Sequence, residues 1–254
     1  MIFEFKGLNV QYDVFGQGER LILIHGWGGP EPWAQYVPDL VSMGLQVFVI
    51  SLPGFGGSDI PGEIIDSEYY AELVQKFLEE LEIERPIILG HSLGGKVALI
   101  LQAKYHLAKE LVLTGSAGYK RFYLGVTLKV ILAKIGKFIL GLLGGFGRNV
   151  ARREKFLSLI ASEDELQSGE MKESFRKIIS EDIRHILKEI KIPTLLIWGD
   201  ADSQTPLIDG VEMSREIEGS KLKIIKGAGH FAFMDYPEIF FKLVKEFIEN
   251  NRNS

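Results

Sequence analysis

Ser92 stands in the stretch GHSLGG (residues 90–95), between an apolar run that ends before it and another that begins after it. The residues from Gly90 to Gly94 match the pattern G-x-S-x-G, which is typical of a sharp turn from a strand into a helix. In such a turn the serine hydroxyl is exposed, and the positions two before and two after it must be small. The motif alone leaves two interpretations open: Ser92 is a nucleophile, or it caps a helix in a tight turn.

A nucleophilic serine needs a base, an acid that orients the base, and N–H donors that stabilise an oxyanion. Candidates stand in three other loops that follow apolar runs. These are His230 in GAGHF, Asp200 or Asp202 in WGDAD, and the glycine-rich stretch HGWGG at 25–29. The sequence therefore offers the parts of a serine hydrolase, provided that the fold brings these loops together.

The elements that would position these loops alternate between strands and helices. Six apolar runs predict strands that are buried on both faces and therefore mostly parallel; they cover residues 21–26, 45–53, 86–92, 110–116, 193–200 and 221–227. Helical patterns lie between them, at 33–43, 67–82, 95–106, 209–218 and 237–250. IFEF and NVQYDVF alternate around Gly7, as in an antiparallel hairpin at the edge of a sheet.

This order predicts an α/β fold with a doubly wound, mostly parallel sheet. Ligands of such sheets lie beyond the carboxyl ends of the strands, which is where all the candidate loops fall. Residues 1–118 and 189–254 are expected to form this core. Residues 119–188 interrupt the alternation with helical patterns, so we expect a helical cap inserted over the sheet.

The most apolar part of the predicted cap is residues 122–146. Lys129, Lys134 and Lys137 interrupt it, so it lacks the uncharged run of about 18 residues that a membrane span needs. The three lysines fall on one side of a helix and leave a broad apolar face. This pattern favours a cap helix over an element that lies on a membrane surface.

Composition excludes several kinds of chemistry. The chain has 254 residues and no cysteine, which rules out disulfides, thiolate zinc sites and a cysteine nucleophile. Its formal net charge of −5 argues against nucleic-acid binding. Glu4 and Lys6 stand where a signal peptide would be apolar, so a cytoplasmic location is expected.

Together these motifs resemble the α/β-hydrolase family over essentially the whole chain. LIHGWGG (23–29) resembles the oxyanion loop of that family, LPGFGGSD (52–59) the loop after the next strand, and GHSLGG the nucleophile elbow. WGDAD (198–202) resembles the acid loop and GAGHF (227–231) the histidine loop. The order Ser92, Asp202, His230 is that of the family.

The resemblance implies a role for each residue. Ser92 would attack an acyl carbonyl, His230 would accept and return the proton, and Asp202 would orient the imidazole. The family spacing from Gly199 selects Asp202 rather than Asp200. The backbone N–H groups of Trp27 and Leu93 would form the oxyanion hole, and His25 would brace its loop through hydrogen bonds. No metal or organic cofactor is implied.

The same motifs are similar to those of small carboxylesterases, including the pimeloyl-[acyl carrier protein] methyl ester esterase type. A small acyl ester is therefore the expected substrate, hydrolysed in a pocket whose candidate lining residues are Trp27, Phe122, Tyr123, Leu140 and Phe233. Residues 120–155 hold nine basic residues against Glu154 alone. They are either solvated helix faces, which we favour, or a docking surface for an acidic carrier protein.

Two other functions remain open. A carbon–carbon bond hydrolase of vinylogous diketones would use the same triad. A hydrolase-fold protein that binds a small molecule with little turnover would keep the fold without the chemistry.

Overall fold

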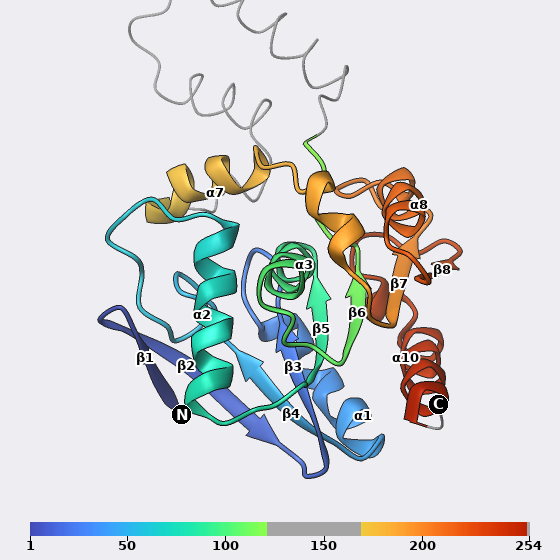
Figure 1. The fold of residues 1–254 in the computed structure, drawn as a ribbon, viewed down its shortest axis with the longest axis horizontal. Coiled ribbons are helices and arrows are strands. Elements are labelled where there is room, and N and C mark those ends of the chain that lie inside the picture. The colour runs from blue at the N-terminus through green and yellow to red at the C-terminus, as the bar shows by residue number, and fades with distance from the viewer. Residues whose placement is uncertain (121–168, 253–254) are drawn as a thin grey trace, which may run out of the picture.

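The computed structural model describes residues 1–120 and 169–252. Within these ranges eight strands form one sheet in the order β1-β2-β4-β3-β5-β6-β7-β8 (Figure 1). Their bounds are β1 Ile2–Phe5, β2 Leu8–Phe15, β3 Glu19–Ile24, β4 Leu45–Ile50, β5 Ile87–His91, β6 Glu110–Thr114, β7 Thr194–Gly199 and β8 Lys221–Ile225. The predicted α/β fold with a doubly wound sheet is confirmed.

The sheet is antiparallel at one edge and parallel elsewhere. β1 pairs with β2, and β2 pairs with β4, both antiparallel, as the alternating residues around Gly7 predict. All the pairs from β4 to β8 are parallel. The carboxyl ends of these strands consequently lie along one edge, where Ile24 pairs with Gly90 and His91 with Thr114.

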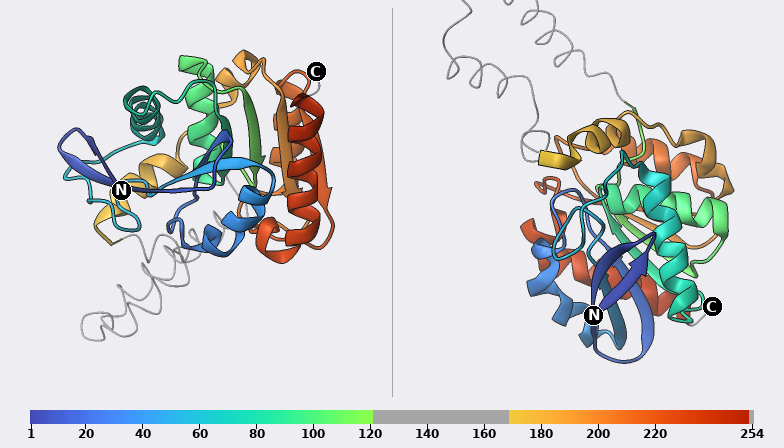
Figure 2. Two further views of the ribbon diagram at one scale, coloured as in Figure 1. Left: turned by 90° about the horizontal axis from the view of Figure 1, so that it is seen from below. Right: turned by 90° about the vertical axis from the view of Figure 1, so that its left-hand side faces the viewer.

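Helices cover both faces of the sheet, as Figure 2 shows. One face packs against α2 (Ser67–Glu80), α3 (Leu93–Tyr105) and α8 (Leu207–Glu216), and the other against α1 (Val37–Ser42) and α10 (Pro237–Arg252). Two shorter helices belong to the second layer, η1 (Glu31–Tyr36) and α9 (Ala232–Asp235). Each face therefore has its own hydrophobic core.

β8 differs from the sequence prediction. The stretch 221–227 was expected to be buried on both faces, but Lys221, Lys223 and Ile224 are exposed. The expectation is wrong because β8 is the last strand of the sheet and only β7 pairs with it. An edge strand with two lysines discourages pairing with other chains.

The described end of the predicted cap comprises η2 (Gly169–Met171), α7 (Lys172–Ile179) and η3 (Arg184–Glu189). Figure 1 shows α7 at the end of the sheet toward which β5 and β6 point. Most of the predicted cap, including the stretch 122–146 and the basic residues between 121 and 155, lies outside the described residues. No helix in the described ranges is long and apolar enough to cross a membrane.

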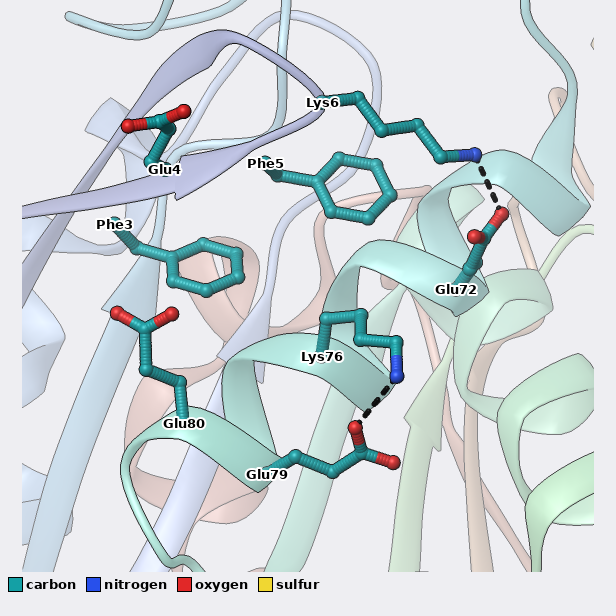
Figure 3. A pocket seen from close by; sticks show the side chains of 8 residues that line it. All are labelled: Phe3, Glu4, Phe5, Lys6, Glu72, Lys76, Glu79 and Glu80. Carbon is teal, nitrogen blue, oxygen red and sulfur yellow. Dashed lines mark hydrogen bonds and ion pairs between the residues drawn. The ribbon is translucent and has the colours of Figure 1, made fainter.

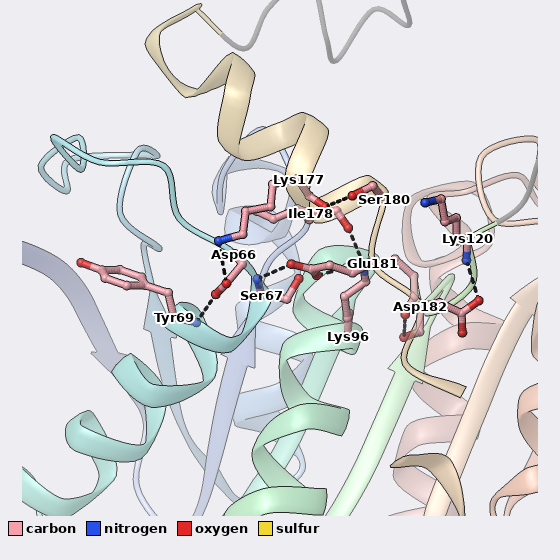
Figure 4. A network of polar contacts seen from close by, with 12 residues as sticks. Asp66, Ser67, Tyr69, Lys96, Lys120, Lys177, Ile178, Ser180, Glu181 and Asp182 are labelled. Atoms are coloured by element: carbon pink, nitrogen blue, oxygen red, sulfur yellow. Dashed lines mark hydrogen bonds and ion pairs between the residues drawn. The ribbon is translucent and has the colours of Figure 1, made fainter. Parts of the chain in front are cut away.

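Polar contacts fasten α7 to the core (Figure 4). Lys96 of α3 is buried, and its Nζ donates to the carbonyl of Ile178 at 2.7 Å and lies 3.4 Å from Glu181. Glu181 also accepts the backbone N–H of Ser67 at the start of α2, at 3.1 Å. Burial lowers the pKa of Lys96, and the contact with Glu181 opposes this effect by favouring the charged ammonium. The sequence analysis did not identify Lys96.

The turn between β5 and α3 has no room for side chains. A Cβ atom at Gly94 would overlap the carbonyl oxygen of Ile24, and one at Gly90 would lie 2.5 Å from the carbonyl oxygen of Gly94. A Cβ atom at Gly95 would collide with Ser116. The prediction that glycine is required on both sides of Ser92 is confirmed.

Gly94→Ala should therefore destabilise the protein, because the methyl group meets rigid backbone of β3. We expect the free energy of unfolding in urea to fall by about 1–3 kcal/mol. Gly62→Ala is the matched control, since Gly62 is exposed and a Cβ atom there meets nothing within 4 Å. Equal stability of the two variants would contradict the close approach of α3 to the sheet.

Candidate active site

Ser92 lies at the turn between β5 and α3 in a rare backbone conformation. Its φ is 51° and its ψ is −112°, a region in which a residue with a Cβ atom is strained. The backbone around the turn maintains this conformation. The N–H of Ser92 donates to Thr114 at 3.1 Å, and its carbonyl accepts the N–H of Ala117 at 3.0 Å. The surrounding sheet thus keeps the serine at the position a nucleophile elbow requires.

Asp202 and His230 lie together beyond the ends of β7 and β8. His230 Nδ1 lies 2.9 Å from Asp202 Oδ2, and both side chains are buried. Gly115, with φ of 49°, gives them space, because a Cβ atom there would lie 3.1 Å from His230 Nδ1. Asp200 instead accepts the N–H of Gly227 at 2.6 Å, which stabilises the histidine loop. The structure thus distinguishes the two candidate acids.

Hydrogen bonds maintain Asp202 as a carboxylate. Its Oδ1 accepts the backbone N–H groups of Gln204 at 2.8 Å and Thr205 at 2.9 Å. Burial by itself raises the pKa of Asp202, but the contacts with His230 and Thr205 outweigh it, so the pKa lies below its ordinary value. An ionised acid beside the imidazole is what stabilises an imidazolium during catalysis.

The candidate nucleophile and the candidate base are not joined by a direct hydrogen bond. In residues 1–120 and 169–252, the hydroxyl of Ser92 makes no hydrogen bond to His230. The residue before Ser92 does contact the histidine, since the ring of His91 lies 4.7 Å from that of His230, centroid to centroid. Such contacts are often loose until substrate is bound.

Two backbone N–H groups at this turn are available to an oxyanion. A Cβ atom at Gly26 would lie 3.2 Å from Ser92 Cβ, so the loop that contains Trp27 adjoins the serine. The N–H groups of Trp27 and Leu93 have no hydrogen-bond acceptor among the described residues. Leu93 is the first residue of α3, where the helix dipole favours negative charge.

His25 braces the loops next to the serine. It is fully buried, its Nε2 accepts the N–H of Leu52 at 3.0 Å, and its Nδ1 lies 2.6 Å from the carbonyl of Gly26. Because Nε2 is the acceptor, Nδ1 carries the proton and donates it to Gly26. The predicted bracing role is confirmed.

His91 is a residue of the site that the sequence analysis did not identify. It is buried, and burial lowers its pKa to about 3, with the neighbouring His230 adding to the effect. Its Nε2 lies 3.1 Å from the carbonyl of His230, which can only accept, so the neutral ring donates there. His91 thus ties the histidine loop to the residue that precedes Ser92. The only signal for it in the sequence was its position directly before Ser92 in GHSLGG.

The candidate pocket residues are only partly placed near Ser92. Trp27 packs against Phe55 and against Phe175 of α7, with ring centroids 4.8 Å apart in each case. The prediction that Phe233 lines the pocket is wrong. Its side chain is fully buried in the core on the α1 and α10 face of the sheet, where its ring stacks on that of Trp33 with centroids 3.7 Å apart. Phe122, Tyr123 and Leu140 lie outside the described residues. The sequence analysis did not identify Phe55 and Phe175.

A groove on the surface lies away from these residues, between the β1–β2 hairpin and α2 (Figure 3). Phe3 and Phe5 form its floor, and Lys6 pairs with Glu72 at 2.8 Å on its rim. None of its lining residues comes from the loops that carry the triad candidates.

The fold and the site define a class of protein. An eight-stranded sheet with a strained serine at the β5–α3 turn and a histidine–aspartate pair beyond later strands is the arrangement of the α/β hydrolases. The family model described as alpha/beta hydrolase fold matches residues 19–237. The chain belongs to this family, and its assignment as a hydrolase follows from that membership.

Relatives of known function include two kinds of hydrolase. The chain is 26% identical over 271 residues to a 2-hydroxy-6-oxononadienedioate/2-hydroxy-6-oxononatrienedioate hydrolase of Pseudomonas putida, covering 95% of this chain and 92% of the relative. An esterase of Exiguobacterium antarcticum has a similar structure, with a TM-score of 0.76, 22% identity and 96% of each chain covered. A meta-cleavage product hydrolase of Pseudomonas fluorescens has a TM-score of 0.73, 21% identity and 96% of each chain covered. At these identities the structural similarities concern the fold.

The buried histidine at position 25 predicts a loss of stability in acid. Burial lowers the pKa of His25 from 6.5 to about 4, so the unfolded chain takes up a proton at a higher pH than the folded chain. This contribution is complete above pH 6.5 and is lost as the pH falls toward 4. Between pH 7 and pH 5 the free energy of unfolding should fall by about 2 kcal/mol from this cause.

Urea unfolding of His25→Gln at pH 7 and pH 5 measures this contribution. The decrease in the free energy of unfolding between the two pH values should be smaller than in the wild type by about 2 kcal/mol. His185→Gln is the control, since His185 is exposed and should leave the pH dependence unchanged. An unchanged decrease in His25→Gln would show that His25 does not stay neutral in the folded protein.

Proposed function

We propose that the protein is a serine hydrolase that cleaves carboxylic esters through an acyl-enzyme. The observation that carries the proposal is the buried Asp202–His230 pair together with the strained Ser92, whose preceding residue His91 contacts His230. A structural serine at a tight turn would need neither partner. The N–H groups of Trp27 and Leu93 support the same chemistry, because they have no acceptor among the described residues and belong to the loop beside Ser92 and to the residue after it.

The proposed reaction uses each group in turn. His230 accepts the proton of the Ser92 hydroxyl as the oxygen attacks the ester carbonyl, and Asp202 stabilises the imidazolium. The N–H groups of Trp27 and Leu93 stabilise the oxyanion. His230 then protonates the leaving alcohol, which releases it and leaves Ser92 acylated. Water attacks the acyl-enzyme with His230 again as base, and the acid is released.

Aromatic side chains near the oxyanion loop support an apolar acyl group as part of the substrate. Trp27, Phe55 and Phe175 form a continuous cluster, and Met171 lies against the loop at Gly54. Phe175 and Met171 belong to α7 and η2, within the predicted cap, so that segment contributes to this environment. Apolar walls with few polar groups are typical of small-molecule pockets.

Carbon–carbon bond hydrolysis of a vinylogous diketone is the second candidate. The observation that favours it is the P. putida relative, whose similarity extends over 95% of this chain. The same triad and oxyanion donors would serve that reaction. We favour the ester because the side chains described around Trp27, namely Phe55 and Phe175, are aromatic and form an apolar environment.

Replacement of the nucleophile tests the mechanism. Ser92→Ala should lower kcat for p-nitrophenyl esters on the order of 10⁴-fold or more, because no oxygen remains to be acylated. Ser42→Ala is the control, since Ser42 is exposed on α1 and its hydroxyl contacts only the carbonyl of Asp39, at 2.6 Å. Hydrolysis that survives in Ser92→Ala would disprove the mechanism.

A comparison of substrates tests the reaction class. A series of p-nitrophenyl esters of increasing chain length and a vinylogous diketone should be assayed with the same enzyme preparation. We expect kcat/KM to be higher for the best ester than for the diketone. The reverse order would assign the chain to carbon–carbon hydrolysis, whereas no turnover and no labelling by a fluorophosphonate would favour a binding protein.

A further inference from the structure

Thr205 is a buried residue whose hydroxyl contacts both Asp202 and His230 of the candidate triad. Its Oγ1 lies 2.9 Å from Asp202 Oδ2, 3.2 Å from His230 Nδ1 and 2.9 Å from the carbonyl oxygen of Gly115. Its backbone N–H donates to the other carboxylate oxygen of Asp202 at 2.9 Å. No other described side chain contacts both Asp202 and His230 through hydrogen bonds.

The surroundings of Thr205 restrict its motion. Pro206 follows it and excludes the helical conformation, and the branched Cβ of threonine limits its rotamers. The indole of Trp198, fully buried on β7, donates to the carbonyl of Thr205 at 2.7 Å. Both the N–H and the carbonyl of Thr205 are thus hydrogen-bonded, and its hydroxyl has a defined position beside the carboxylate.

The chemistry of the hydroxyl selects its main partner. It has one proton and two acceptors at the same distance, Asp202 Oδ2 and the Gly115 carbonyl. If it donated to Gly115, its lone pairs would face a carboxylate oxygen at 2.9 Å. A hydrogen bond to an ionised acceptor is also stronger than one to a neutral carbonyl. Donation to Asp202 is therefore favoured, and Oδ2 then accepts from Thr205 and from His230 together.

We propose that Thr205 is a positioning residue of the triad: its hydroxyl fixes the Asp202 carboxylate so that Oδ2 faces His230 Nδ1, and it shares the negative charge of that oxygen. Fixing Oδ2 keeps the His230 proton on Nδ1 and leaves Nε2 free to accept the proton of Ser92. The inference rests on the proposed function.

Other ionisable groups near His230 do not offer the same role. Within the described part of the chain, His91 of β5 faces the imidazole and is a buried, neutral ring, with His25 beyond it. Asp235 of α9 accepts the N–H of Gly229 at 2.7 Å and so fixes the loop rather than the ring. Removal of the Thr205 hydroxyl therefore takes one hydrogen-bond donor from the Asp202 carboxylate and leaves these groups in place.

The test compares Thr205→Val, which keeps the shape and removes the hydroxyl, with Thr205→Ser, which retains it. Thr194→Val is the matched control, because Thr194 is a buried threonine at the opposite end of β7 whose hydroxyl donates to Ile192 at 3.0 Å. The readout is the rate constant for fluorophosphonate labelling of Ser92 in the full-length protein as a function of pH. This rate reports activation of the nucleophile without knowledge of the substrate.

Thr205→Val should lower the plateau of the labelling rate by about 10-fold, the effect of one hydrogen bond to a charged group. The acid limb of its pH profile, where the labelling rate falls as the pH is lowered, should move to higher pH. The reason is that a carboxylate with one donor fewer attracts the imidazolium more strongly. Thr205→Ser should restore the limb and most of the rate, and Thr194→Val should match the wild type. A wild-type limb in Thr205→Val, or failure of Thr205→Ser to restore it, overturns the inference.

Labelling of Ser92→Ala distinguishes a failure of the inference about Thr205 from a failure of the proposed function. If Ser92→Ala abolishes labelling while Thr205→Val behaves as the wild type, the triad stands and only the role of Thr205 is wrong. If the wild-type protein does not label, or Ser92→Ala still labels, the proposed function is wrong and the role of Thr205 is wrong with it.

Discussion

The close approach of α3 to the carboxyl ends of β3 and β5 is the constraint on which the site depends. At Gly94 the helix touches the carbonyl of Ile24, so this residue can only be glycine. The approach forces Ser92 into a strained conformation, and the hydrogen bonds to Thr114 and Ala117 maintain it. It also brings the first N–H of α3 next to the loop after β3. One steric condition thus produces both the strained, half-buried serine and the candidate oxyanion donors.

Buried polar side chains determine the position of the loops around that turn. His25 joins the loop after β3 to the loop after β4, and His91 joins the elbow to the histidine loop. Both rings are neutral because burial disfavours their charged forms. They act as fixed hydrogen-bonding groups, and the site contains three histidines of which we assign proton transfer to His230 alone.

Asp202 is the contrasting case, in which burial does not neutralise the group. Backbone N–H groups, His230 and Thr205 supply donors to both carboxylate oxygens, and together they outweigh the cost of burial. On the side of α7, Lys96 likewise remains buried with a backbone carbonyl and Glu181 as partners. Charged groups at this end of the sheet are thus retained where several partners surround them.

The sequence by itself determined the order of the elements, the sheet class and the loops that carry the candidate triad, because hydrophobic periodicity and glycine positions are local properties. The resemblance to the α/β hydrolases, whose acid stands at a set spacing from the residue equivalent to Gly199, then favoured Asp202 over Asp200. Only the tertiary structure decided which residues meet across loops, and so it assigned Phe233 to the core, β8 to the sheet edge, and Thr205, His91 and Lys96 to positions at or beside the site. Contacts between residues far apart in the chain depend on how helices and strands pack, and a linear pattern does not record that packing.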